Sequence, residues 1–152
     1  MRRTTPFPPQ MFLIILAVVT VIGLILLFLP SEANQAKKTV QQFYKHEQNW
    51  DFISAWELFH PDMQAKFTKP SYLQNRSHIF MDHFGVDSFS FTLEKPKKRT
   101  NWRMNEDQEP FDTAYEITVT KEYNGTYGRF KLVQDVFVVR DEKAWKILWD
   151  YN

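Results

Sequence analysis

The chain of 152 residues contains no cysteine. That absence excludes a disulfide framework, a metal centre with thiolate ligands and an anchor attached to a lipid-modified cysteine. An excess of charge of one sign is also lacking, because the formal net charge is +1. Such a chain has no strong field to recruit nucleic acid, so we expect no nucleic-acid partner. Internal repeats and low-complexity tracts are absent as well.

One long hydrophobic run is present, over residues 11–29 (MFLIILAVVTVIGLILLFL), and it contains no charged residue. As a helix, a run of this length spans about 28 Å, close to the hydrocarbon thickness of a bilayer. The sequence therefore predicts a transmembrane helix over 11–29 that contacts membrane lipid. It follows a tail at 1–10 and precedes a connector at 30–35 and a folded domain at 36–152.

The charges beside the run predict its orientation. Arg2 and Arg3 precede it, and positive residues favour the cytoplasmic side. We therefore expect a single-pass cell-membrane protein with a cytoplasmic N-terminus and an extracytoplasmic C-terminal domain. A cleaved secretory signal is the alternative, with small residues available at Ser31 and Ala33, although the run exceeds the usual length of a signal core.

The first half of the domain has helical periodicity. An apolar stripe predicts a helix from residue 34 onward, formed by Ala36, Val40, Phe43 and Tyr44. Asp51 is a candidate N-cap of a second helix that ends before Pro61, and a short turn is expected to follow. A third helix is predicted after Pro70, with Gly85 at its end.

The second half changes to the alternation typical of strands, over 89–93, 115–119, 130–138 and 145–151. Asn124–Gly125 is a strong hairpin signal, because both residues tolerate positive φ. The charged segment 95–110 lacks a clear pattern and is expected to form strand ends and a long exposed loop. The predicted fold is α+β, with three helices packed on a curved antiparallel sheet of about four strands.

Several motifs in this order resemble the nuclear transport factor 2-like superfamily. They are the aromatic pair Phe43-Tyr44, the segment Phe111-Asp112-Thr113-Ala114-Tyr115 and the final Trp145-Lys146-Ile147-Leu148-Trp149-Asp150. The chain is most similar, over about 35–151, to the N-terminal non-catalytic domain of methicillin-resistance-type penicillin-binding proteins. The resemblance implies a cone-shaped domain that acts as a spacer or docking module. The Ser-x-x-Lys motif of the transpeptidase domain is absent, so no acylation chemistry is implied.

Six residues are candidates for a pocket or a partner contact. His78 and Asp82 stand four apart on one helical face, which suits an acid–base pair or two metal ligands. A metal site needs three or four ligands, so we predict no metal. Since the sequence shows no convergent set of catalytic residues, we also predict no cofactor and no catalytic residue. Isomerases and dehydratases of the superfamily use polar side chains that point into the cone between sheet and helices. Four further residues could point inward in this way: Tyr44, His60, Tyr72 and Tyr115.

Two functions remain open at this point. The first is a membrane-anchored, non-catalytic interaction or scaffold module of the bacterial cell envelope, which docks a protein partner or a second copy of itself. The alternative is a small-molecule-binding or lyase/isomerase-type domain that uses the apolar cone. A deep pocket with inward His, Asp and Tyr would favour the second function. A cone filled by Phe, Trp and Tyr would favour the first.

Overall fold

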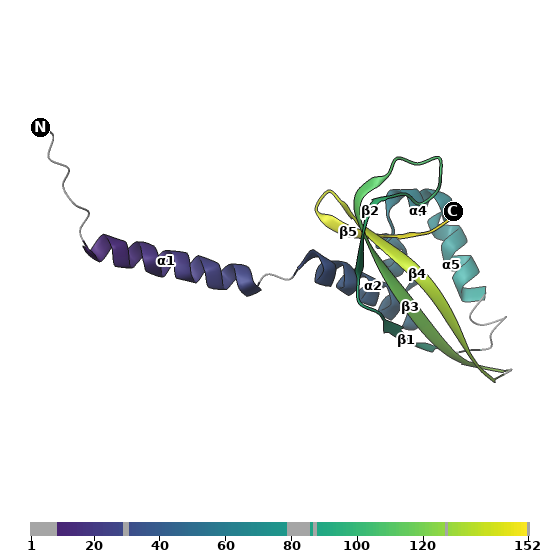
Figure 1. Cartoon of the computed structure of the whole chain (residues 1–152). Coiled ribbons are helices and arrows are strands. Elements are labelled where there is room, and N and C mark those ends of the chain that lie inside the picture. The colour runs from purple at the N-terminus through teal and green to yellow at the C-terminus, as the bar shows by residue number, and fades with distance from the viewer. Residues whose placement is uncertain (1–8, 29–30, 79–85, 87, 127, 152) are drawn as a thin grey trace, which may run out of the picture. The chain divides into compact units, whose positions relative to one another are not determined.

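The computed structural model describes residues 9–28, 31–78, 86, 88–126 and 128–151 (Figure 1). The chain divides into two compact units, Met1–Ser31 and Glu32–Asn152. The first unit contains the helix α1 (Pro9–Phe28), and the second contains the other helices and the strands.

The prediction of a membrane anchor is contradicted by the structure, which forms helix α1 over most of the hydrophobic run. Its described side chains, at 11–21, 23 and 24, are uncharged and exposed. Crossing a bilayer takes about 20 consecutive apolar residues. Among the described residues, no helix has both the length and the apolar character for a membrane crossing. The predicted transmembrane helix is therefore wrong for the described chain. The single-pass cell-membrane location and the cytoplasmic and extracytoplasmic sides derived from it are wrong as well.

The helices of the second unit largely follow the apolar periodicity. They are α2 (Glu32–Gln48), α3 (Phe52–Glu57), α4 (Pro61–Lys66) and α5 (Lys69–His78). Helix α2 begins at Glu32, so part of the predicted connector is helical. Asp51 caps α3 as predicted, because its carboxylate accepts a hydrogen bond of 3.1 Å from the Ser54 amide. Helix α4 lies where a turn was expected, and the predicted end at Gly85 lies outside the described residues.

The strands form one antiparallel sheet that contains β1 (Phe89–Leu93), β2 (Lys97–Trp102), β3 (Phe111–Gly125), β4 (Gly128–Asp141) and β5 (Ala144–Trp149). The order is β1-β3-β4-β5, and β2 pairs with the first half of β3. The α+β class and the antiparallel sheet are thus confirmed, but the sheet has five strands and not four.

Strand β2 was not predicted as a separate strand, because its segment, expected to form strand ends and a loop, does not alternate between apolar and polar side chains. Most of them are exposed, and the strand is held by backbone pairing with 111–116. Only Trp102 packs closely, with its ring stacked 4.1 Å from that of Phe137. Backbone pairing at a sheet edge leaves little trace in hydropathy, which explains the error.

The long hairpin between β3 and β4 is present, but its turn lies two residues later than predicted. Asn124 and Gly125 belong to β3, and Gly125 pairs with Gly128. Gly128 has φ 108°, a conformation that side-chain-bearing residues rarely adopt. Among the described residues of the hairpin, the positive φ therefore falls on its second glycine.

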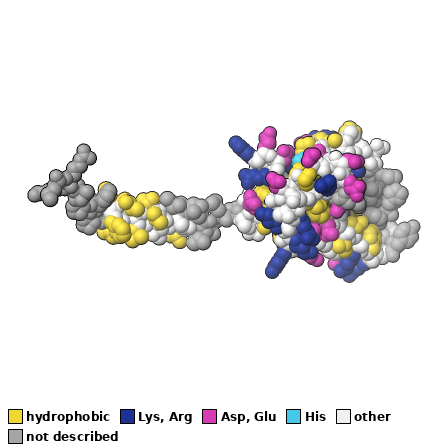
Figure 2. All heavy atoms as spheres, turned by 45° about the horizontal axis from the view of Figure 1, so that its top comes forward, with side chains coloured by type: hydrophobic (Ala, Val, Ile, Leu, Met, Phe, Trp, Pro, Cys, Tyr) yellow, Lys and Arg dark blue, Asp and Glu magenta, His cyan; other side chains and the backbone are white. Residues whose placement is uncertain are grey.

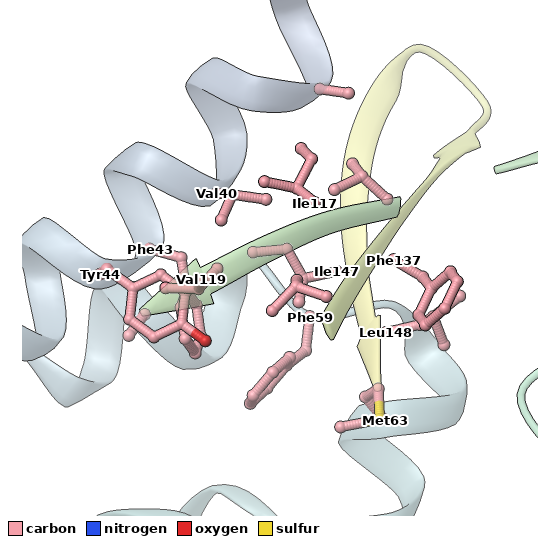
Figure 3. Packing of buried hydrophobic residues seen from close by; sticks show 14 of the residues in the cluster. Val40, Phe43, Tyr44, Phe59, Met63, Ile117, Val119, Phe137, Ile147 and Leu148 are labelled. Atoms are coloured by element: carbon pink, nitrogen blue, oxygen red, sulfur yellow. The ribbon is translucent and has the colours of Figure 1, made fainter. Parts of the chain in front are cut away.

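The hydrophobic core lies between α2 and one face of the sheet, as Figure 3 shows. Val40, Phe43 and Tyr44 project from α2 and are fully buried. The strands contribute the inward positions of their alternation, with Ile117 and Val119 on β3. Phe59, between α3 and α4, joins the cluster and is bridged to Ile147 of β5. Neither layer could bury its apolar side alone.

Candidate functional site

A cluster of charged and phenolic side chains occupies the interior of the domain. The Arg76 guanidinium on α5 donates from Nε to Glu47 Oε1 over 2.7 Å, and its Nη2 lies 2.6 Å from the same oxygen. The Tyr72 hydroxyl donates to this oxygen as well, over 2.6 Å. The Glu47 side chain is fully buried, whereas that of Arg76 is 16% exposed. Glu47 Oε2 has no hydrogen-bond partner among the described residues.

These residues converge because they continue the buried stripes of their helices. Glu47 stands four residues after Phe43 on α2, and Arg76 stands four after Tyr72 on α5. Residues with this spacing share one helical face. Sequence reasoning did not treat Glu47 and Arg76 as a site, although a charged residue inside an apolar stripe is a usable signal.

Lys121 adds a second buried cation. It lies on the inward face of β3 between Val119 and Tyr123 and is 2% exposed. Its Nζ stands 5.3 Å from the centre of the Tyr44 ring. Burial lowers the pKa of Lys121 to about 8, against an ordinary value of 10.5, although Glu47 acts in the opposite direction. Since the charges of Glu47 and Arg76 offset each other, a protonated Lys121 leaves the cluster with one excess positive charge.

Lys121→Met should stabilise the protein at neutral pH. Lys121 loses its proton near pH 8 in the folded state and near pH 10.5 in the unfolded state. The free energy of unfolding of the wild type therefore rises with pH between these values. A gap of this size corresponds to about 3 kcal/mol, of which we expect the variant to recover about 1–3 kcal/mol at pH 7. Urea unfolding at pH 7 and pH 10 measures the gain, which should shrink at the higher pH. The exposed Lys98→Met serves as the control, and a Lys121→Met variant less stable than wild type at pH 7 would contradict the argument.

Two of the predicted site residues belong to this cluster. The Tyr44 hydroxyl donates to Gln134 Oε1 over 3.4 Å, and the Tyr72 hydroxyl donates to Glu47. Burial raises the pKa of both phenols, and the negative charge of Glu47 raises it further. Both hydroxyls are therefore neutral hydrogen-bonding groups at physiological pH.

The other predicted residues do not join them. His60 is the N-cap of α4, where its Nδ1 accepts from the Asp62 amide over 3.3 Å. The Tyr115 hydroxyl donates to Glu32 Oε2 at the start of α2, over 3.2 Å. The side chain of His78 and all of Asp82 lie outside the described residues. In the described part of the chain, no group of three or more His, Cys, Asp or Glu side chains is placed to hold a metal ion.

Aromatic rings fill the centre of the domain. Phe59 lies 5.1 Å from both Phe43 and Trp149 and 5.2 Å from Tyr72, as measured between ring centroids. Two open hollows of about 540 and 450 Å³ occur elsewhere, and neither is lined by Phe43, Phe59 or Trp149. The first lies on the β3–β4 hairpin and includes Arg129 and Lys131. Rings thus fill the space around Phe59, and these two hollows among the described residues lie at the surface.

The free edges of the sheet are mostly protected. Side chains of α2 bind the outer carbonyls of β1, with Gln48 Nε2 donating to Phe89 over 2.6 Å and Lys37 Nζ donating to Leu93 over 3.2 Å. On β5, the Ile147 amide donates to the Leu58 carbonyl over 2.9 Å. The edge of β2 carries the basic run 97–99, and such charges discourage strand addition.

The first half of β4 is the exception. Pairing with β5 begins only at Val136, and no other described strand pairs with 128–135 on the side away from β3. The segment carries two exposed apolar residues, Leu132 at 36% and Val133 at 63% exposure. An unprotected edge strand with apolar side chains can accept another strand by backbone hydrogen bonding. We call residues 128–135 the open edge of β4.

The fold and these features define an α+β domain with a packed aromatic centre, a buried ionic cluster and an open strand edge. The visible face of the domain intersperses both signs of charge (Figure 2). A scan against models of known protein families finds no match, and a search of curated proteins finds no similar chain.

Proposed function

We propose that this chain is a non-catalytic interaction module that docks a protein partner along the open edge of β4. The observation that carries the proposal is the contrast between edges. The outer edges of β1 and β5 are covered by neighbouring segments and that of β2 is basic, whereas in the described part of the chain no strand pairs with 128–135 on the side away from β3, beside the exposed Leu132 and Val133. Natural sheets usually protect such an edge, so its exposure suits a surface used for binding.

Two further points support this function. The resemblance to the N-terminal non-catalytic domain of methicillin-resistance-type penicillin-binding proteins implies a docking or spacer role. The aromatic packing around Phe59 leaves little room for a substrate in the cone, which counts against the small-molecule alternative. The ionic cluster of Glu47 and Arg76 is better explained as a structural element than as a catalytic one, since its charges offset each other.

Site-specific photocrosslinking tests the proposal. A photoreactive amino acid at Val133 of the full chain should form adducts with a protein in the producing cells, identified by mass spectrometry. The same amino acid at Thr100, an exposed position on β2, is the matched control. We expect at least about tenfold more adduct at 133 than at 100. Equal yields at the two positions, or no protein adduct at 133, would contradict docking at this edge.

A further inference from the structure

We infer that the open edge of β4 pairs with the same edge of a second copy of this chain, antiparallel and centred on Leu132. The inference rests on the proposed function and names its partner. Its basis is the order of charges along 129–135, which begins with Arg129 and ends with Asp135. Both residues are exposed.

A two-fold axis perpendicular to the sheet restricts the possible registers. Directly opposite residues must then project from the same face, and the central residue pairs with its own copy. Centring on Leu132 uses all of 129–135 and stops before Val136, where β5 already occupies the edge. Centring on Val133 would place Arg129 opposite Phe137, which pairs with Leu148 of β5. Centring on Lys131 would place two ammonium groups against each other.

The Leu132 register matches side chains on both faces. On the face away from the helices, Arg129 of each copy lies opposite Asp135 of the other, which gives two ion pairs. Opposite charges facing each other across strands stabilise a sheet, and like charges destabilise it. The Asp135 carboxylate also accepts from the Thr118 hydroxyl over 2.6 Å, across the β3–β4 pair on the side away from the open edge.

On the helix-facing side, the same register brings the two Leu132 side chains together at the axis. This contact would cover a leucine that is 36% exposed in the single chain. On the face away from the helices, Val133 would lie opposite Lys131, whose aliphatic stem can pack on it. The register therefore covers both exposed apolar residues and leaves no like charges directly opposed.

Cysteine crosslinking tests the register directly, because the chain has no cysteine of its own. Opposite residues of an antiparallel pair have Cα atoms about 4.5–5.5 Å apart, a distance that a disulfide can bridge. Under mild oxidation of the full-length chain, Leu132→Cys should give a disulfide dimer at least about tenfold above Thr100→Cys. A Val133→Cys dimer as abundant as that of Leu132→Cys would overturn the register, and a Leu132→Cys yield equal to that of Thr100→Cys would overturn self-pairing.

Charge reversal separates the ion pairs from other causes of association. In the Leu132→Cys background, Asp135→Arg should lower the dimer yield at least about tenfold, because Arg129 would then face an arginine. Adding Arg129→Asp should restore the yield, which also shows that the reversed chain still folds. Failure of the double variant to recover would overturn the inference. A partner other than this chain captured at Val133, with no disulfide dimer, would overturn self-pairing while supporting the proposed docking function.

Discussion

Arg76→Met is expected to lower the free energy of unfolding by about 3–5 kcal/mol. The substitution removes the guanidinium that lies 2.6–2.7 Å from Glu47 Oε1 and leaves a fully buried carboxylate with the Tyr72 hydroxyl as its remaining hydrogen-bond donor among the described residues. An uncompensated charge in the interior is costly because water no longer solvates it. Urea unfolding of the full chain, followed by tryptophan fluorescence, measures the loss.

The double variant Glu47→Gln/Arg76→Met separates charge from packing. A neutral amide at position 47 can still accept from the Tyr72 hydroxyl and carries no charge to be compensated. Replacing both partners of a buried ion pair is often nearly neutral, so most of the stability should return. If the double variant is as unstable as Arg76→Met alone, the loss comes from packing of the long side chain, and the electrostatic explanation is wrong.

Phe59→Ala is expected to cost a similar amount, about 3–5 kcal/mol. Phe59 is fully buried and contacts the rings of Phe43, Tyr72 and Trp149 at centroid separations of 5.1–5.2 Å. Its removal would leave a cavity at the junction of the helices and β5, where the surrounding rings can close in only partly. Denaturant unfolding at pH 7 provides the measurement.

Ile53→Ala is the matched control for this prediction, since Ile53 lies on α3 but is 53% exposed. Its truncation should change stability by no more than about 0.5–1 kcal/mol. A Phe59→Ala loss as small as that of Ile53→Ala would show that the aromatic centre is loosely packed. Such a result would reopen the small-molecule alternative, because a loosely packed cone has room for a ligand.

Local signals predicted the elements whose formation depends on neighbouring residues. Asp51 was identified as an N-cap because a short side chain with an acceptor oxygen precedes an apolar helix, and it does cap α3. The buried stripe of α2 followed from spacing alone. Strand β2 was missed because 97–102 is held by backbone pairing with β3, which hydropathy does not record.

The hydrophobic run at 11–29 shows the opposite error, in which the sequence predicted a feature that the described structure does not contain. Hydropathy and length predicted a membrane crossing, whereas no helix in the described residues meets the requirement for one. The prediction of candidate residues was similarly incomplete. Tyr44 and Tyr72 lie in the charged interior, but Glu47 and Lys121 were not among the candidates.

The sequence by itself determined the periods of the helices and strands, the residues on their apolar faces, and the absence of cysteine chemistry. Only the tertiary structure decided that Glu47 meets Arg76, that Lys121 lies beside Tyr44, and that 128–135 keeps an open edge. The physical reason is that periodicity specifies which face of an element is buried. The opposing residue depends on strand register and helix placement, and these are fixed by contacts between distant parts of the chain.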